Sequence, residues 1–137
     1  KEQNNTPAIS SVRILLVEDN KINQKVAALF FQKAGYQYVV ANDGQEAIDI
    51  YSNDQSFDII LMDLMMPRKD GFEASIDIRA YEKSNDIAET PIIAVTASVV
   101  NDDIEQCFKV GMNAYIPKPI QPDKLYSEIE NCLKTKA

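Results

Sequence analysis

Short apolar runs rich in β-branched residues alternate along this chain with longer amphipathic stretches. The runs predict five strands, near residues 12–17, 37–41, 57–62, 91–95 and 113–116. The stretches predict five helices, at about 20–34, 44–53, 71–84, 98–111 and 121–134. Strands this apolar are expected to be buried on both faces, as in a parallel sheet between two helical layers. The chain is therefore predicted to be an α/β protein with a doubly wound, five-stranded parallel sheet flanked by five helices.

The ends of the predicted helices carry residues suited to those positions. Asn20 can cap the first helix, and Gly35 and Gly111 can end helices in the left-handed conformation. A chain of 137 residues is long enough for one substantial core. We therefore expect one domain over residues 12–134, preceded by a polar N-terminal linker over residues 1–11.

The formal net charge of −7 disfavours non-specific binding to nucleic acid and to anionic lipid. The longest apolar runs are too short to span a bilayer, and no signal-peptide pattern opens the chain. We therefore expect a cytoplasmic domain that contacts neither nucleic acid nor membrane, within a parent chain that could be membrane-anchored. Because the chain has no histidine to complete a zinc site, Cys107 and Cys132 are expected to be buried, reduced thiols on helices.

Polar residues follow four of the five predicted strands at the point where each strand ends. Glu18 and Asp19 follow the first strand, Asp63 the third, Thr96 the fourth and Lys118 the fifth. In an open doubly wound sheet, ligands bind outside the carboxyl ends of the strands, where the strand order reverses. For the strand order 2-1-3-4-5 this position lies between strands one and three, so the three acids are expected to converge there.

Three carboxylates within a few ångström repel one another, so one must take up a proton or a cation must bind between them. Mg²⁺ suits a site with two or three carboxylates, because it keeps several of its waters. Lys118 would add a second positive charge, and Thr96 a hydroxyl. Such a set is typical of phosphoryl transfer, with Asp63 as the nucleophile and the adjacent Glu18 and Asp19 as the metal-holding pair.

Each acid also has an ordinary structural explanation when it is taken alone. Glu18 and Asp19 before Asn20 could be part of a helix cap, and Asp63 before Met-Pro could be a turn residue. Chance seldom places chemically matched side chains at four strand ends of one sheet. The whole set therefore favours a functional site.

The same residues lie in segments that resemble the response-regulator receiver domain family. The resemblance covers residues 12–133, through "ILLVEDNKINQKVA", "NDGQEAI", "DIILMDLMMPRKDGFEA", "PIIAVTA" and "GMNAYIPKPI". It implies a flavodoxin-like fold that receives a phosphoryl group from a phosphohistidine in a magnesium-dependent reaction. Carried over by position, it implies Asp63 as phosphoacceptor, Glu18, Asp19, Asp63 and the Met65 carbonyl as metal ligands, Thr96 and Tyr115 as switch residues, and Lys118 as the phosphate-binding lysine before a cis Pro119.

Since the chain has no histidine, its phosphoryl group must come from a histidine kinase, a histidine phosphotransfer domain or a small acyl phosphate. "EDNKINQ" and "GMNAYIPKPI" resemble receivers of hybrid histidine kinases most, so the parent chain is expected to be such a kinase. A free-standing response regulator is the alternative. The domain itself would catalyse only its own phosphorylation and dephosphorylation. Arg68 and Lys69 are more basic than is usual in the family, which bears on the choice of partner.

Two other classes of protein fit parts of the pattern. A magnesium-dependent phosphatase of the haloacid-dehalogenase type also uses an aspartate nucleophile, but it needs an acid two residues later, where this chain has Met65. A pseudo-receiver that acts only as a binding module usually lacks part of the acid, threonine and lysine set. The missing acid disfavours the phosphatase, and the complete set disfavours the pseudo-receiver.

Phosphorylation is expected to act as a charge-driven switch. An aspartyl phosphate adds about one to two negative charges and strong acceptor oxygens, which would give Thr96 and Lys118 new partners. If Thr96 moves inward, it leaves space for Tyr115. The lifetime of this state is expected to be moderate or long, because Met65 cannot orient a hydrolytic water, whereas the small Ser98 leaves a route open.

The first predicted helix carries two apolar lines, one of which suits packing on the sheet. The second line, Ile22, Val26 and Leu29, is either the edge of a wide core face or an exposed docking patch. We predict the docking patch: Ile22 and Val26, with Pro119 and Ile120, are expected to meet a helical histidine donor.

Overall fold

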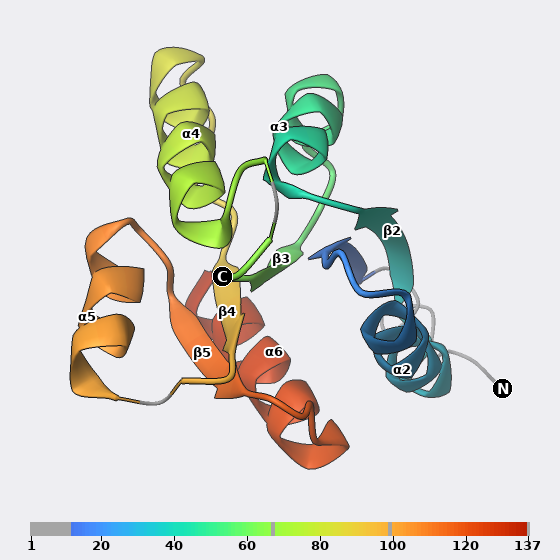
Figure 1. The fold of residues 1–137 in the computed structure, drawn as a ribbon. Coiled ribbons are helices and arrows are strands. Elements are labelled where there is room, and N and C mark those ends of the chain that lie inside the picture. Colours follow the sequence, from blue (N-terminus) through green and yellow to red (C-terminus); the bar gives the residue numbers. More distant parts are fainter. Residues whose placement is uncertain (1–11, 67, 99, 137) are drawn as a thin grey trace, which may run out of the picture.

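The structure is a computed structural model, and it describes residues 12–66, 68–98 and 100–136. Within these residues, strands and helices alternate as predicted (Figure 1). The elements are β1 (Arg13–Val17), α2 (Lys21–Ala34), β2 (Gln37–Ala41), α3 (Gly44–Asn53), β3 (Ile59–Asp63), α4 (Gly71–Ser84), β4 (Ile92–Thr96), α5 (Asn101–Lys109), β5 (Ala114–Pro117) and α6 (Pro122–Lys136). The predicted linker, residues 1–11, lies outside the described residues.

The strands of the described residues form one parallel sheet in the order β2-β1-β3-β4-β5, which confirms the predicted topology. β1 lies between β2 and β3, so the strand order reverses beside β1. At the carboxyl ends, Asp63 is in register with Val95, and Thr96 with Pro117. The polar residues that end the strands therefore lie along one edge of the sheet.

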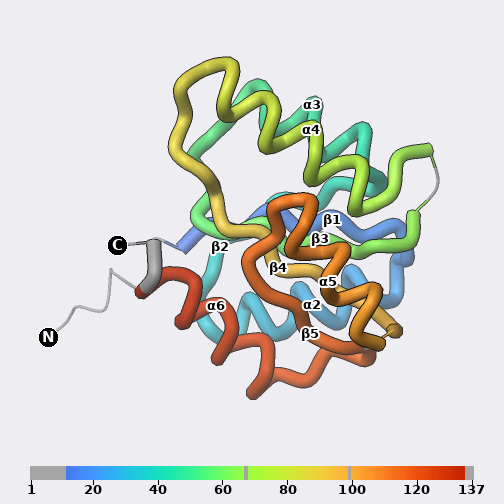
Figure 2. The backbone as a smooth tube through the Cα atoms, turned by 90° about the vertical axis from the view of Figure 1, so that its left-hand side faces the viewer, coloured from blue at the N-terminus to red at the C-terminus, as the bar shows by residue number. Residues whose placement is uncertain are grey.

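Two helical layers cover the sheet (Figures 1 and 2). One face packs on α3, α4 and α5 through a core that includes Leu15, Ile60, Tyr51, Ile78 and Cys107. The other packs on α2 and α6 through a core that includes Ile14, Leu61, Phe31, Leu125 and Ile129. Neighbouring residues of β1 and of β3 belong to different cores, because successive side chains of a strand point to opposite faces. Both faces are thus buried, as the apolar strands predicted.

The helix ends agree with the sequence patterns except at α5. The Asn20 side chain accepts a hydrogen bond from the Asn23 amide, and Gly35 ends α2 at a φ of 79°. The helix predicted to begin at residue 98 begins instead at Asn101. At the predicted start, the Ser98 amide donates to the Thr96 hydroxyl at 3.0 Å, so Ser98 belongs to the turn after β4 and not to the helix.

Cys107 and Cys132 are free and buried on helices, as predicted. Burial raises the pKa of both thiols, which keeps them protonated and unreactive. In the described part of the chain, every helix is too short or too polar to cross a membrane.

Candidate functional site at the carboxyl edge of the sheet

The three predicted acids converge at the point where the strand order reverses. Glu18 directly follows β1, and its amide donates to the Ala41 carbonyl at 3.0 Å, which fixes the start of the β1–α2 loop. One carboxylate oxygen from each of Glu18, Asp19 and Asp63 lies within 4.8 Å of the others. Glu18 and Asp63 are buried, whereas Asp19 is exposed, so the cluster opens to solvent on the Asp19 side.

The spacing of this acid cluster (Glu18, Asp19 and Asp63) fits a small hard cation. Oxygen ligands lie about 2.0–2.1 Å from Mg²⁺, so ligands on opposite sides of the ion are about 4 Å apart. The observed separations of up to 4.8 Å need only a slight closure to reach that value. Carboxylate oxygens are also the donor type that Mg²⁺ prefers. The residues present therefore fit the predicted ion.

Lys118 lies beside the acid cluster, as the sequence predicted. Its Nζ is 2.9 Å from Asp63 Oδ1 and 3.9 Å from Glu18 Oε1. Its amide donates to the Thr96 carbonyl at 2.8 Å, and the Lys118–Pro119 peptide is cis, as expected. The lysine thus supplies one positive charge to a group of three acids.

The pKa of Glu18 reflects its burial and its neighbours in the cluster. Burial is the largest cause and the charge of Asp63 acts in the same direction, whereas the Asn20 amide and Lys118 favour the carboxylate; together they raise the pKa of Glu18 to about 7. The Asn20 amide donates to Glu18 Oε2 at 3.1 Å. Near neutral pH Glu18 is therefore protonated in part of the molecules. Uptake of a proton is one of the two ways to relieve the repulsion among three carboxylates, the other being a bound cation.

The loop after Asp63 is held close to the cluster. The Gly71 amide donates to the Leu64 carbonyl at 3.0 Å and closes the base of this loop. A Cβ on Gly71 would run into the Asp63 carbonyl oxygen, so only glycine allows α4 to begin here. The Met65 side chain is 78% exposed, and its amide lies 3.5 Å from Asp63 Oδ1. That the Met65 carbonyl is a metal ligand stays a prediction.

The Thr96 hydroxyl is buried, but its hydrogen bonds are made within its own turn. It donates to the Ser98 carbonyl and accepts from the Ser98 amide, both at 3.0 Å. Ser98 Oγ in turn donates to Asp103 Oδ2 at 2.5 Å, in the first turn of α5. Tyr115 is half-buried and packs against the core under α3, α4 and α5. The turn after β4 is thus joined directly to α5, and the switch roles of Thr96 and Tyr115 stay predictions.

The second apolar line of α2 is exposed, so a wide core face is excluded. Ile22 is 72% exposed and Leu29 58%, whereas Ala27 and Phe31 on the other line are fully buried. Val26, Pro119 and Ile120 line one hollow together with Glu18, Asn23 and Lys118. Ile22 lies one turn before Val26 on the same helix. The predicted docking residues therefore lie next to the acid cluster.

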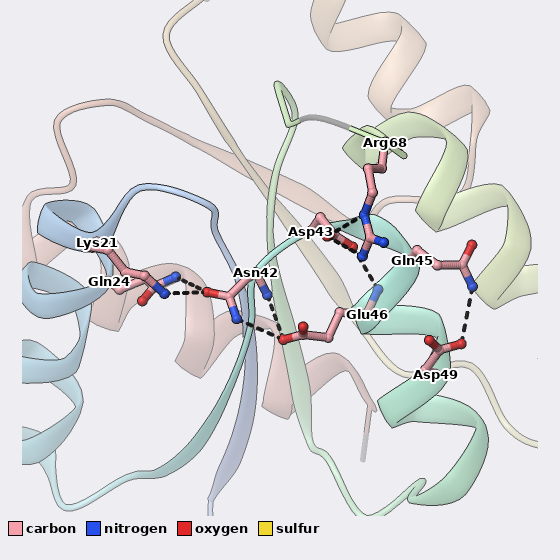
Figure 3. A network of polar contacts seen from close by, with 8 residues as sticks. All are labelled: Lys21, Gln24, Asn42, Asp43, Gln45, Glu46, Asp49 and Arg68. Carbon is pink, nitrogen blue, oxygen red and sulfur yellow. Dashed lines mark hydrogen bonds and ion pairs between the residues drawn. The ribbon is translucent and has the colours of Figure 1, made fainter.

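A polar network beside the cluster was not predicted from the sequence (Figure 3). It includes Arg68, whose guanidinium binds Asp43, while its neighbour Lys69 forms an ion pair with Asp77. The sequence predicts that both basic residues bear on partner preference, but the structure gives each an internal partner. No local sequence signal marks the Arg68–Asp43 pair, since the two residues are far apart in the chain.

Comparison with known proteins gives one consistent result. A family model described as the response regulator receiver domain matches residues 14–130. The chain is 36% identical over 137 aligned residues to probable histidine kinase 4 of Oryza sativa subsp. japonica, covering 88% of this chain and 14% of that protein. It is 39% identical over 121 residues to hybrid signal transduction histidine kinase I of Dictyostelium discoideum, covering 85% of this chain and 7% of that protein. The chain thus spans a small part of these relatives.

Two solved structures have the same fold over nearly the whole chain. One is the co-crystal structure of the Saccharomyces cerevisiae histidine phosphotransfer signaling protein Ypd1 and the receiver domain of its downstream response regulator Ssk1, with 34% identity, a TM-score of 0.87, and coverage of 93% of this chain and 92% of that chain. The other is the receiver domain of sensor histidine kinase PA1611 from Pseudomonas aeruginosa PAO1, with a magnesium ion coordinated in its active site cleft. It has 35% identity, a TM-score of 0.81, and coverage of 90% of this chain and 98% of that chain.

Proposed function

The chain belongs to the response regulator receiver domain family, and from this premise we propose that residues 12–134 form a domain that accepts a phosphoryl group on Asp63. The observation that carries the proposal is the position of Asp63. It ends β3 within the acid cluster, with Lys118 Nζ 2.9 Å from its Oδ1. A buried carboxylate that a lysine holds at the open edge of a sheet is suited to nucleophilic attack on phosphorus.

In the proposed reaction, a carboxylate oxygen of Asp63 attacks the phosphorus of a phosphohistidine in line. The new O–P bond forms as the P–N bond breaks, and the imidazole nitrogen keeps the electron pair of that bond. Lys118 binds a phosphoryl oxygen beside Asp63. Glu18, Asp19, Asp63 and the Met65 carbonyl are the proposed ligands of Mg²⁺, which when bound would neutralise charge on the transferred group. The magnesium ion named for the Pseudomonas receiver supports this assignment.

The structure suggests how the switch would reach the surface. In the unphosphorylated state the Thr96 hydroxyl is bonded to Ser98, and Ser98 is bonded to Asp103 at the start of α5. If Thr96 turned to a phosphoryl oxygen, both hydrogen bonds to Ser98 would break and the start of α5 would be released. Tyr115, which is half-buried, would then fill the vacated space. Phosphorylation would shift the population between two such arrangements.

We propose a histidine kinase or a histidine phosphotransfer domain as the donor, and a hybrid histidine kinase as the parent chain. The kinase names of the relatives and the yeast complex of a phosphotransfer protein with a receiver domain support these two assignments. A free-standing response regulator is the alternative. We propose that the domain is cytoplasmic. Its net charge of −7 supports the proposal that it makes no direct contact with nucleic acid or membrane.

The proposal is tested by incubating the protein with Mg²⁺ and a small acyl phosphate, followed by intact mass spectrometry and peptide mapping. We expect one phosphoryl group per chain, located on the peptide that contains Asp63. A chain that binds Mg²⁺ but gains no phosphoryl group from either a small donor or a phosphohistidine protein would instead be a pseudo-receiver.

Ile22→Asp should weaken phosphoryl transfer from a phosphohistidine protein. Burying an isoleucine side chain contributes about 1.5–3 kcal/mol, so losing this contact at the interface should slow transfer by about 10- to 100-fold. Phosphorylation by a small acyl phosphate needs no docking and should be retained. The matched control is Ile76→Asp, which changes an exposed isoleucine on α4 that is 52% accessible. Equal transfer rates in the wild type and Ile22→Asp would rule out this docking surface.

Met65→Asn should shorten the lifetime of the phosphorylated protein. The exposed Met65 side chain stands two residues after Asp63 and cannot position water, whereas an amide can. We expect the half-life to shorten by about tenfold. A general base would accelerate hydrolysis by roughly a hundredfold or more, but an amide can only orient the water and does not accept its proton. The measurement is loss of the phosphoryl group in magnesium buffer after donor removal. An unchanged or longer half-life in the variant would contradict this account.

A further inference from the structure

A continuous set of hydrogen bonds joins α2 to the β2–α3 turn beside the acid cluster (Figure 3). Gln24 Nε2 donates to the backbone carbonyl of Glu18 at 2.6 Å and to Asn42 Oδ1 at 2.9 Å. Lys21 Nζ also donates to Asn42 Oδ1, at 2.8 Å. Asn42 donates from its amide and its Nδ2 to Glu46 Oε1, at 2.9 and 3.0 Å. The backbone of Glu18 is thereby fixed against the first turn of α3.

The same turn of α3 also holds the loop that follows β3. Arg68 donates to Asp43 Oδ2 from Nε at 2.9 Å and from Nη2 at 2.5 Å. Asp43 Oδ1 caps α3 by accepting from the Glu46 amide at 2.8 Å. Burial alone would raise the pKa of Asp43, but the Glu46 amide and the Arg68 guanidinium bring that pKa below its usual value. The Gly44 amide donates to the Lys69 carbonyl at 3.0 Å, and a Cβ on Gly44 would run into that carbonyl.

Arg68 has a strained backbone conformation that neighbouring contacts must stabilise. Its φ is 66°, in the left-handed region, where a residue other than glycine is sterically strained. Such a conformation persists only where surrounding contacts determine it, here the two hydrogen bonds to Asp43. Met65 lies in the loop between this contact and the closed base at Leu64 and Gly71. Both ends of the segment that carries Met65 are therefore held.

We propose that Gln24 and Arg68 are positioning residues for the divalent cation, an inference that rests on the metal site of the proposed function. Gln24 holds the segment of Glu18 and Asp19, and Arg68 holds the loop of Met65. Both residues are anchored to the start of α3, Gln24 through Asn42 and Arg68 through Asp43. The two segments that supply the proposed ligands are therefore held in a fixed position relative to each other. A metal site whose ligands are held in place binds its ion more tightly, because less ordering is needed on binding.

The direction of the effect separates positioning from simple electrostatics. Replacing Arg68 by a neutral residue removes a positive charge near the site and leaves the Asp43 carboxylate unpaired. The surroundings become more negative by one charge, which by itself would tighten the binding of a cation. If Arg68 acts by positioning, its loss weakens cation binding instead. The sign of the change in affinity therefore decides between the two roles.

The experiment measures Mg²⁺ affinity by isothermal titration calorimetry on wild type, Gln24→Met and Arg68→Gln. Methionine keeps the size of Gln24 but removes its donor. Loss of residues that orient metal ligands typically costs about 10- to 100-fold in affinity, so we expect the Mg²⁺ Kd to rise about tenfold in Gln24→Met. In Arg68→Gln the lost positive charge offsets part of this cost, so we expect a smaller rise of about threefold. Arg68→Lys, which keeps the charge and one donor group, should recover part of the loss. The Mg²⁺ concentration for half-maximal phosphorylation by a small donor should rise in parallel, with the maximal rate retained.

Matched controls come from the same two helices. The Gln45 side chain donates to Asp49 at 3.1 Å, a hydrogen bond within α3 that involves neither of the two loops. The Gln32 side chain, on α2, donates to the Tyr38 hydroxyl at 3.3 Å. Gln45→Met and Gln32→Met should leave the Mg²⁺ affinity unchanged. An unchanged Kd in Gln24→Met, tighter binding in Arg68→Gln, or an equal loss in the controls would overturn the inference while leaving the proposed function intact. A wild-type protein that does not bind Mg²⁺ would overturn the proposed metal site and this inference together.

Discussion

Asp63→Asn should take up no phosphoryl group from a small acyl phosphate in magnesium buffer. Asparagine has the size of aspartate, but its neutral amide is not a nucleophile toward phosphorus. Glu18 is a poor substitute, because its pKa is raised to about 7, chiefly by burial, so a large fraction of the molecules carry it protonated at neutral pH. Asp19 is exposed, whereas the ion pair that Lys118 makes at 2.9 Å is with Asp63. The measurement is intact mass after incubation, with the wild type run in parallel.

The matched control for this variant is Asp70→Asn. Asp70 caps α4 by accepting from the Glu73 amide at 2.9 Å, and asparagine is an equally good cap, so the fold should be kept. The control should be phosphorylated like the wild type, and thermal unfolding checks that Asp63→Asn is folded. A phosphoryl group found on folded Asp63→Asn would place the acceptor at another residue and refute the assignment.

The strand order and the converging acids follow from information that is local in the sequence. Each strand is a short apolar run, and each helix shows apolar residues at helical spacing. The alternation of strands with helices therefore predicts a doubly wound sheet. Once that topology holds, residues that follow strands must meet at one edge. Asp63 and Thr96 differ slightly from prediction, since they are the last residues of β3 and β4 rather than the first residues after them. The position of the acid cluster in the fold was therefore predictable from the sequence to within a residue.

Two features of α2 and α5 could not be read from the pattern. Whether Ile22 and Leu29 are exposed depends on the width of sheet that α2 covers, and helical periodicity alone does not give that width. The late start of α5 depends on the hydrogen bonds between the Thr96 hydroxyl and Ser98. A threonine hydroxyl has several backbone partners of similar energy, and only the folded turn selects one of them.

The hydrogen bonds of Arg68 and Gln24 are also invisible in the sequence. Arg68 reaches Asp43 because its backbone enters the left-handed region, which is unusual for arginine and has no sequence signal here. Gln24 reaches the Glu18 carbonyl because α2 begins at Lys21, which places residue 24 in the first helical turn, next to the loop between β1 and α2. Such contacts form between loops that are far apart in the sequence and come together only in the folded chain. The acids can therefore be predicted from the sequence, but the residues proposed to position them cannot.

Removing divalent cations should slow phosphorylation of Asp63 by about 100-fold or more. The acid cluster offers three carboxylates within 4.8 Å, and Lys118 supplies one positive charge to them. An incoming phosphoryl donor is itself an anion. Two unit charges 4 Å apart interact by about 4 kcal/mol at an effective dielectric constant of 20, and each 1.4 kcal/mol is about a factor of ten in rate. Lys118 offsets only part of this repulsion.

The measurement is the initial rate of phosphorylation by a small acyl phosphate, followed by intact mass, with Mg²⁺ or with excess chelator. Adding Mg²⁺ beyond the chelator should restore the rate, which excludes damage by the chelator itself. Asp19→Asn should need a higher Mg²⁺ concentration for the same rate, because it loses a charged ligand. Asp102→Asn, which changes an exposed aspartate in the first turn of α5, should behave like the wild type. A rate that is the same in chelator and in Mg²⁺ would show that Lys118 and the shared proton on Glu18 suffice to admit the anion. The acid cluster would then be a proton-binding site, and its fit to a cation would have no role in the reaction.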